Sequence, residues 1–220
     1  MGTGAGVRAL APAMPHLILL GDSIFDNQSY VPGDPDVVRQ VRAVLPPGWT
    51  ASLLAVDGAT TASLPGQMAR LPNGATHLVV SMGGNDALGA SHVLGERVSH
   101  VAEAVAKLAR AQARFAAGYE AALDRVLAAG LPTAICTIYD TPRTEGDEPV
   151  IQTALCLFND VISRAAFSRG LPLIDLRLIC NEDADYANPI EPSARGGAKM
   201  ARAIAGLAEG GWSRQVVAGG

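Results

Sequence analysis

The sequence contains five short apolar runs, each of strand length, separated by turn residues or by stretches with helical periodicity. The runs are rich in Val, Ile and Leu and do not alternate cleanly with polar residues. This pattern is typical of strands buried on both faces, as in a parallel sheet that carries helices on each side. We therefore predict strands at residues 16–20, 51–56, 77–82, 133–138 and 171–176.

Helical patterns lie between these runs. The clearest covers residues 96–129, where apolar residues recur at spacings of three and four. Further helices are expected at 36–44 and 149–168, and Ser193 is placed to cap a last helix that reaches about residue 208. Alternating strands and helices imply right-handed crossovers. The predicted fold is α/β, a three-layer α/β/α sandwich with a five-stranded parallel sheet, as in flavodoxin-like proteins.

The length of 220 residues fits one such domain. We expect residues 1–15 to be a flexible N-terminal tail, 16–208 the single domain and 209–220 a C-terminal tail. No secretory signal is recognisable, and no segment comes near the roughly 20 apolar residues of a membrane span. Cys136, Cys156 and Cys180 are odd in number and widely spaced, which is typical of buried free thiols in a reducing cytosol. We therefore expect a cytoplasmic protein with no membrane partner.

The charge pattern narrows the class of ligand. The formal net charge is −4 and the sequence has no cluster of Lys and Arg, which argues against a nucleic-acid partner. No His, Cys and carboxylate residues recur at metal-ligand spacing, so neither a metal nor an organic cofactor is expected. A small molecule is the expected ligand.

Polar residues follow three of the predicted strands. Gly21-Asp22-Ser23 ends the first, Gly58 follows the second, and Gly83-Gly84-Asn85-Asp86 ends the third. Because the carboxyl ends of parallel strands meet at one edge of a sheet, these segments belong to one site despite their separation along the chain. Acyl transfer requires a nucleophile and donors aimed at the developing oxyanion, and a serine beside backbone and amide N–H groups suits that chemistry.

The Gly-Asp-Ser and Gly-Gly-Asn-Asp blocks together resemble those of the SGNH (GDSL-like) serine hydrolases. The resemblance implies that Ser23 is the nucleophile. It also implies that the N–H of Ser23, the N–H of Gly58 and the side-chain amide of Asn85 hold the oxyanion. The expected function is then an esterase-type hydrolase that acts on a small acyl ester through an acyl-Ser23 intermediate.

Other functions remain open at this point. An acyl transferase would use the same residues, and a catalytically silent homologue would bind an acyl, glycan or protein ligand. A flavodoxin-like nucleotide binder would need a glycine-rich phosphate loop after the first strand, and the Gly21-Asp22-Ser23 turn is too poor in glycine for that role.

The last block of the family, Asp-x-x-His-Pro, is altered here, because no histidine follows His100. When the segment is aligned on Pro192, Glu191 takes the place of the histidine and Asn188 that of the aspartate. A second frame places Asp185 at the aspartate and Asn188 at the histidine. Glu191 can act as the base only if burial or a neighbouring acid raises its pKa toward the working pH. Alternatively, Glu191 is a solvated residue that precedes a helix N-terminus and has no catalytic role.

Structural interpretations compete with several of these assignments. Ser23 could be a helix N-cap and Gly58 an ordinary turn glycine. Asp22 is expected to order the turn or cap the following helix, and Asp86 to cap or shape its own loop.

The four histidines differ in their predicted position. His16 and His77 open strands, so they lie at the edge away from the site, and His100 is expected on the surface of the long helix. His92 follows Asn85 by seven residues, in a loop at the site edge. It is the possible alternative base, although an exposed loop histidine is the commoner case.

Overall fold

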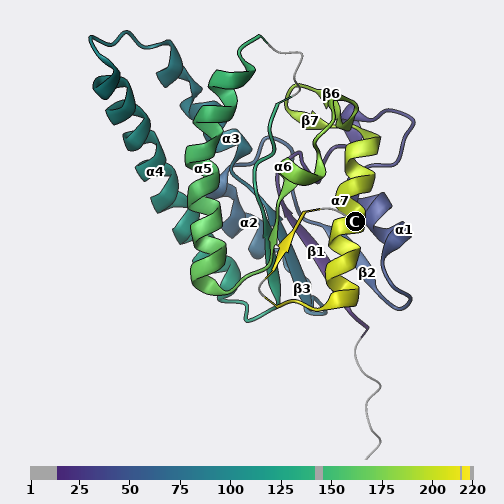
Figure 1. The fold of residues 1–220 in the computed structure, drawn as a ribbon. Coiled ribbons are helices and arrows are strands. Elements are labelled where there is room, and N and C mark those ends of the chain that lie inside the picture. The colour runs from purple at the N-terminus through teal and green to yellow at the C-terminus, as the bar shows by residue number, and fades with distance from the viewer. Residues whose placement is uncertain (1–13, 142–145, 214, 219–220) are drawn as a thin grey trace, which may run out of the picture.

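The computed structural model describes residues 14–141, 146–213 and 215–218. At its centre is a parallel sheet with the strand order β2-β1-β3-β4-β5-β8 (Figure 1). The strands are β1 (His16–Gly21), β2 (Thr50–Leu53), β3 (His77–Ser81), β4 (Thr133–Cys136), β5 (Leu173–Ile174) and β8 (Val216–Val217). The predicted α/β fold with a parallel sheet is confirmed.

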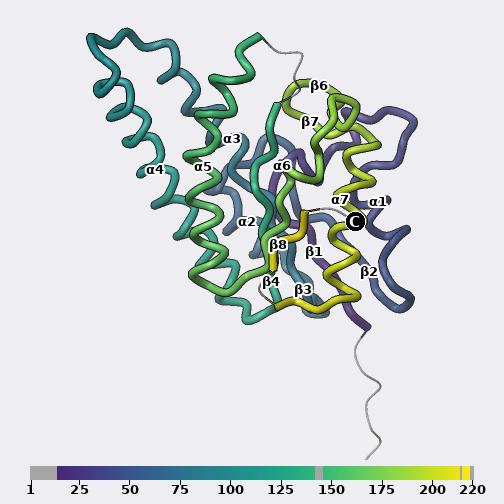
Figure 2. Tube along the Cα trace, in the orientation of Figure 1, coloured from purple at the N-terminus to yellow at the C-terminus, as the bar shows by residue number. Residues whose placement is uncertain are grey.

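Helices cover both faces of this sheet, with α4 and α5 on one side and α1 and α7 on the other (Figures 1 and 2). The α-helices are α1 (Val37–Val44), α2 (Leu64–Met68), α3 (Gly84–Ala90), α4 (Val101–Leu127), α5 (Glu148–Arg169), α6 (Leu176–Ile179) and α7 (Ala194–Gly210). Short 3-10 helices are η1 (Gln28–Tyr30), η2 (Thr61–Ser63), η3 (Ser91–Gly95) and η4 (Asp183–Asp185), and a separate hairpin joins β6 (Tyr186–Asn188) to β7 (Glu191–Pro192).

Two hydrophobic cores explain why the central strands do not alternate between apolar and polar residues. In β1, Leu17 and Leu19 belong to the core formed with α1 and α7. Ile18 and Leu20 point the other way, into the core formed with α4 and α5. Because successive side chains of a strand face opposite sides, a strand covered on both faces has no polar positions to alternate with.

The sheet has one strand more than the five predicted. The added strand is β8, which lies among residues 209–220, expected to be a tail. Val216–Val217 pairs with β5, where the N–H of Leu173 donates to Gln215 O at 2.8 Å and that of Asp175 to Val217 O at 2.8 Å. The two residues of β5 are recognisable because they lie in the longer apolar run 171–176, whereas those of β8 lie in no such run. Of the expected N-terminal tail, residues 1–13 lie outside the described residues.

The longest helix differs from its prediction at its start. It begins at Val101 and not at residue 96, because His100 is the N-cap, its ring accepting the N–H of Glu103 at 3.1 Å. The helix is otherwise continuous through Gly118. Its second half packs on the sheet through residues such as Phe115. Its first half reaches past the sheet, and Val101 is 79% exposed. The apolar stripe of the sequence therefore serves the core over only part of its length.

The α5 helix is, among the described residues, the one helix long and apolar enough to span a membrane by length and composition, which the sequence analysis did not anticipate. A core helix meets the same criteria, and Ile162, Ala165 and Ala166 of α5 are buried in the core beside the sheet. Cys156 is exposed on this helix, whereas the other two cysteines are buried, so the expectation of three buried thiols holds for two of them.

Candidate active site

The first site segment leaves β1 through a turn that only glycine can form. Gly21 has φ +136°, and a Cβ at this position would lie 1.8 Å from the carbonyl oxygen of Ser81. The side-chain amide of Gln67 in α2 holds the backbone of Gly21 on both sides. Its Nε2 donates to Gly21 O at 2.6 Å, and its Oε1 accepts the N–H of Gly21 at 2.8 Å. Contacts of Gly21 with β3 and with α2 therefore fix the turn that carries Ser23. Nothing in the sequence singled out Gln67, because an isolated glutamine carries no motif.

Ser23 is 6% exposed and lies in the turn after β1. It does not cap a helix, because the first helix after it, η1, has Asn27 as its N-cap residue. Asp22 orders this turn, as expected, with its carboxylate accepting the N–H of Ile24 at 3.2 Å. Burial raises the pKa of Asp22 to about 7, and repulsion from Glu191 and Asp86 adds to the increase. Asp22 is thus also a protonatable group beside the serine.

The second and third segments are joined to each other. The side-chain amide of Asn85 donates to Ala59 O at 3.0 Å. The carboxylate of Asp86 accepts the N–H of Thr61 at 3.0 Å and its hydroxyl at 2.7 Å, which is the loop-shaping role expected for it. Gly58 belongs to the same loop and has φ +75°, so the turn itself favours glycine there. Asn85 lines the same pocket as Ser23, whereas Gly58 is exposed and is not among the residues that line it.

Glu191 reaches this edge from the far end of the chain. It stands in β7 and is 4% exposed, so it is not a solvated residue. Three side chains hold the surrounding backbone. Tyr139 donates to Ile190 O at 2.9 Å, Thr141 to Pro189 O at 3.3 Å, and Asn27 to Pro192 O at 3.2 Å. Asn27 is buried and also accepts the N–H of Val37, so it ties the segment after Ser23 to the segment that carries Glu191.

The side chain of Ser23 lies beside the carboxyl group of Glu191, close enough to affect its pKa. Burial raises the pKa of Glu191 to about 7; the interaction with Ser23 acts in the opposite direction, and repulsion from Asp57 adds to the increase. Within the described part of the chain, Glu191 forms no ion pair and its Oε2 has no hydrogen-bond partner. One oxygen is therefore free to interact with a ligand.

The residues of the second alignment frame, Asp185 and Asn188, do not meet Ser23. Asp185 is fully buried and paired with Lys199 at 2.6 Å and Arg195 at 3.5 Å, and it does not line the pocket that contains Ser23. Asn188 accepts the N–H of Ile190 at 3.0 Å, a contact within its own loop. The frame aligned on the proline is the one that brings a carboxylate to Ser23.

None of the four histidines lines that pocket. His92 lies in η3, where it is exposed, and its ring contacts Gly89 O at 3.0 Å. His16 pairs with Ser52 at 2.9 Å, and the His77 ring lies between those of Trp49 and Trp212, tilted by 41° and 39°. Across residues 14–141, 146–213 and 215–218, no group of three or more His, Cys, Asp and Glu side chains is arranged to hold a metal ion.

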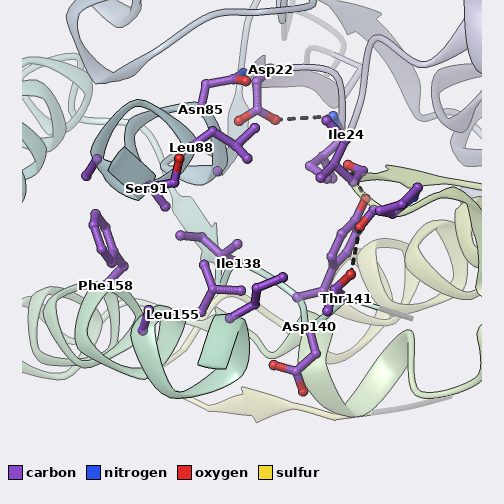
Figure 3. A pocket seen from close by; sticks show the side chains of 18 of the residues that line it. Asp22, Ile24, Asn85, Leu88, Ser91, Ile138, Asp140, Thr141, Leu155 and Phe158 are labelled. Carbon is purple, nitrogen blue, oxygen red and sulfur yellow. Dashed lines mark hydrogen bonds between the residues drawn. The ribbon is translucent and has the colours of Figure 1, made fainter. Parts of the chain in front are cut away.

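A pocket of about 250 Å³ opens beside Ser23 (Figure 3). Asp22, Ser23, Asn85 and Glu191 all contribute to its lining. The remaining lining comes mainly from apolar side chains of α3, α4 and α5. In Figure 3, Leu88, Ser91 and Phe158 lie on one side of the opening and Ile24 and Thr141 on the other.

Comparison with known proteins finds a matching family and solved structures with a similar fold. The model of the GDSL-like Lipase/Acylhydrolase family matches residues 19–199. Similar solved structures include an extracellular lipase from Streptomyces rimosus (19% identity, 84% of this chain and 95% of that chain, TM-score 0.61). A lipase/acylhydrolase from Enterococcus faecalis (17% identity, 92% and 99%, TM-score 0.61) and an acetyl xylan esterase (16% identity, 85% and 96%, TM-score 0.64) are also similar. A search of curated proteins finds no match.

Proposed function

Because the chain belongs to the GDSL-like lipase/acylhydrolase family, we propose that it is an esterase-type serine hydrolase in which Ser23 is the nucleophile and Glu191 the base. One observation carries this proposal. The side chains of Ser23 and Glu191 meet at one end of an apolar pocket, and both are buried. A nucleophile in contact with a protonatable group is the basic unit of covalent acyl transfer.

The reaction follows from this contact. Glu191 takes the hydroxyl proton of Ser23 as Oγ attacks the ester carbonyl carbon, and the carbonyl electron pair moves onto its oxygen. When the tetrahedral intermediate collapses, Glu191 returns the proton to the alcohol oxygen as the C–O bond breaks. Acyl-Ser23 remains. Glu191 then deprotonates a water molecule that attacks the acyl carbon, and the proton passes to Ser23 as the acid leaves.

Gly58, the third donor expected from the sequence, is exposed and does not line the pocket. Stabilisation of the oxyanion is therefore assigned to two donors, the N–H of Ser23 and one N–H of the Asn85 amide. That amide has two N–H groups, and the bond to Ala59 O uses one of them. Preorganised donors of this kind account for much of the rate acceleration in acyl transfer.

A carboxylate can replace the family's histidine only under particular conditions, and the site supplies them. With a pKa of about 7, Glu191 is available in both protonation states near neutral pH, which is the optimum for a group that accepts and returns a proton. The protonated acid is neutral, unlike an imidazolium, so it needs no carboxylate to stabilise it. This fits an asparagine, Asn188, at the position of the family's aspartate.

Binding without turnover is the second candidate function. The observation that favours it is the glutamate in place of the histidine. An acyl-binding protein of this kind would keep the pocket and lose the reactivity of Ser23.

Hydrolysis of a short-chain aryl ester tests the assignment. We expect turnover that survives chelators, is lost in Ser23→Ala and is retained in His92→Ala. Turnover should be lost in Glu191→Gln but kept at least in part in Glu191→His, which restores the family's residue. If His92→Ala is inactive and Glu191→Gln behaves as the wild type, the loop histidine is the base. Full activity in Ser23→Ala would end the serine hydrolase assignment. Products formed with an added alcohol in place of water would identify an acyl transferase.

A further inference from the structure

The polar residues of the pocket beside Ser23 gather mainly around the serine, although Ser91, Asp140 and Thr141 line it elsewhere (Figure 3). Its polar end holds the serine, Asp22, Asn85 and Glu191. The long helices contribute only apolar side chains to the other end, namely Leu108, Ala111, Ile151, Ala154, Leu155 and Phe158. A sugar ring presents hydroxyl groups that would remain without hydrogen-bond partners in such surroundings, at a high cost in free energy. The apolar end is therefore suited to a hydrocarbon.

The direction of this apolar end relative to the reacting bond decides which half of an ester it holds. In the proposed mechanism the leaving alcohol oxygen must lie near Glu191, from which it receives its proton. Asn85 is in the first turn of α3, and the apolar wall continues along that helix through Ala87 and Leu88 toward α4 and α5. The hydrocarbon thus extends away from the leaving group, on the acyl side of the carbonyl carbon.

The mouth of the pocket is apolar as well. Leu88 and Leu94 both line it and are 45% and 43% exposed. Exposed aliphatic side chains that continue into an apolar cavity are typical of the entrance for an apolar ligand. The volume of about 250 Å³ is small for a ligand pocket, so it suits one chain and not the several chains of a lipid.

We infer that the pocket between α3, α4 and α5 binds a single unbranched acyl chain of medium length, such as octanoyl, and so selects medium-chain acyl esters over acetyl esters. This inference rests on the proposed function for its reaction, but the binding of the chain does not depend on turnover. Each buried methylene should strengthen transition-state binding about threefold to fourfold.

Two series of esters test which half of the substrate the pocket holds. With p-nitrophenol as the constant leaving group, kcat/KM should rise from acetate through butyrate and hexanoate to octanoate, by at least about a hundredfold overall. With acetate as the constant acyl group, lengthening the alcohol from ethyl to octyl should have little effect. A flat or falling acyl series overturns the inference, and so does a rise confined to the alcohol series.

A substitution that fills the pocket tests its position. Ala154→Phe should lower the octanoate-to-acetate ratio of kcat/KM at least tenfold. Ala113→Phe is the matched control, because Ala113 is exposed on α4 and does not line the pocket, and its ratio should equal that of the wild type. An unchanged ratio in Ala154→Phe would place the chain elsewhere.

A binding measurement separates this inference from the hydrolase assignment. Octanamide is neutral and resists hydrolysis, so calorimetry with Ser23→Ala reports chain binding alone. Octanamide should bind far more tightly than acetamide. If octanamide does not bind while short esters are hydrolysed, the hydrolase proposal stands and the acyl-chain inference fails. If it binds while the wild type hydrolyses no ester, the inference stands and the hydrolase proposal fails.

Discussion

Two buried carboxylates near the C-terminus, Asp185 and Glu191, are six residues apart and have opposite surroundings. Asp185 is paired with Lys199 and Arg195 at the start of α7. Glu191 has no cation within the described residues and contacts the hydroxyl of Ser23, whereas each of the two carboxylates keeps one oxygen without a hydrogen-bond partner there. A paired buried carboxylate holds a fold together, whereas an unpaired one destabilises it and is available for chemistry. Burial alone therefore does not identify a functional carboxylate, but burial without a cation does.

The largest expected effect is on turnover. Glu191→Gln keeps the size of the side chain but removes its basicity, so kcat should fall by about a hundredfold to ten-thousandfold. Asp185→Asn should leave kcat of the folded protein near that of the wild type. Steady-state kinetics on a single ester checks both variants. Equal losses in the two variants would show that the difference between the carboxylates is not catalytic.

A smaller effect is expected at the oxyanion. Asn85→Ala should lower kcat about a hundredfold, the usual cost of losing one such donor. Because the amide also supports Ala59 O, the free energy of unfolding must be measured alongside. If kcat is unchanged in a folded Asn85→Ala variant, the assignment of this amide to the oxyanion is wrong.

The smallest effect, on stability, should have opposite signs for the two carboxylates. Asp185→Asn should lower the free energy of unfolding by about 2 kcal/mol, because it removes the buried partner of Lys199 and Arg195 and leaves them only the exposed Glu182. Glu191→Gln should raise it by about 2 kcal/mol near pH 8, because it removes an unpaired buried charge. Urea unfolding of both variants measures the difference.

The pH dependence of that gain follows from the raised pKa of Glu191. Between its ordinary value of 4.5 and about 7, the native state holds the proton and the unfolded state does not. The free energy of unfolding contributed by this group therefore falls as pH rises through that window. The advantage of Glu191→Gln should shrink toward zero near about pH 4. A constant difference at all pH values would contradict the raised pKa.

The sequence predicted the fold and the meeting of the site segments, because both depend on local patterns. Strand-length apolar runs fix the sheet, and polar residues at the carboxyl ends of parallel strands share an edge. The pattern could not show that the first half of α4 lines a pocket, since Leu108 and Phe115 look alike in a helical stripe. It also could not show the clamp by Gln67 or the tie made by Asn27, because both depend on contacts between distant elements.

The central claim is that Glu191 activates Ser23, and the rate at which a fluorophosphonate labels Ser23 tests it most directly. The rate should rise with pH through about 7, where Glu191 loses its proton, and level off above that value. In Glu191→Gln, labelling should be slower by at least about a hundredfold and should lose this pH dependence. A Ser23 that is not labelled at any pH, or one that is labelled equally fast in Glu191→Gln, would contradict the claim.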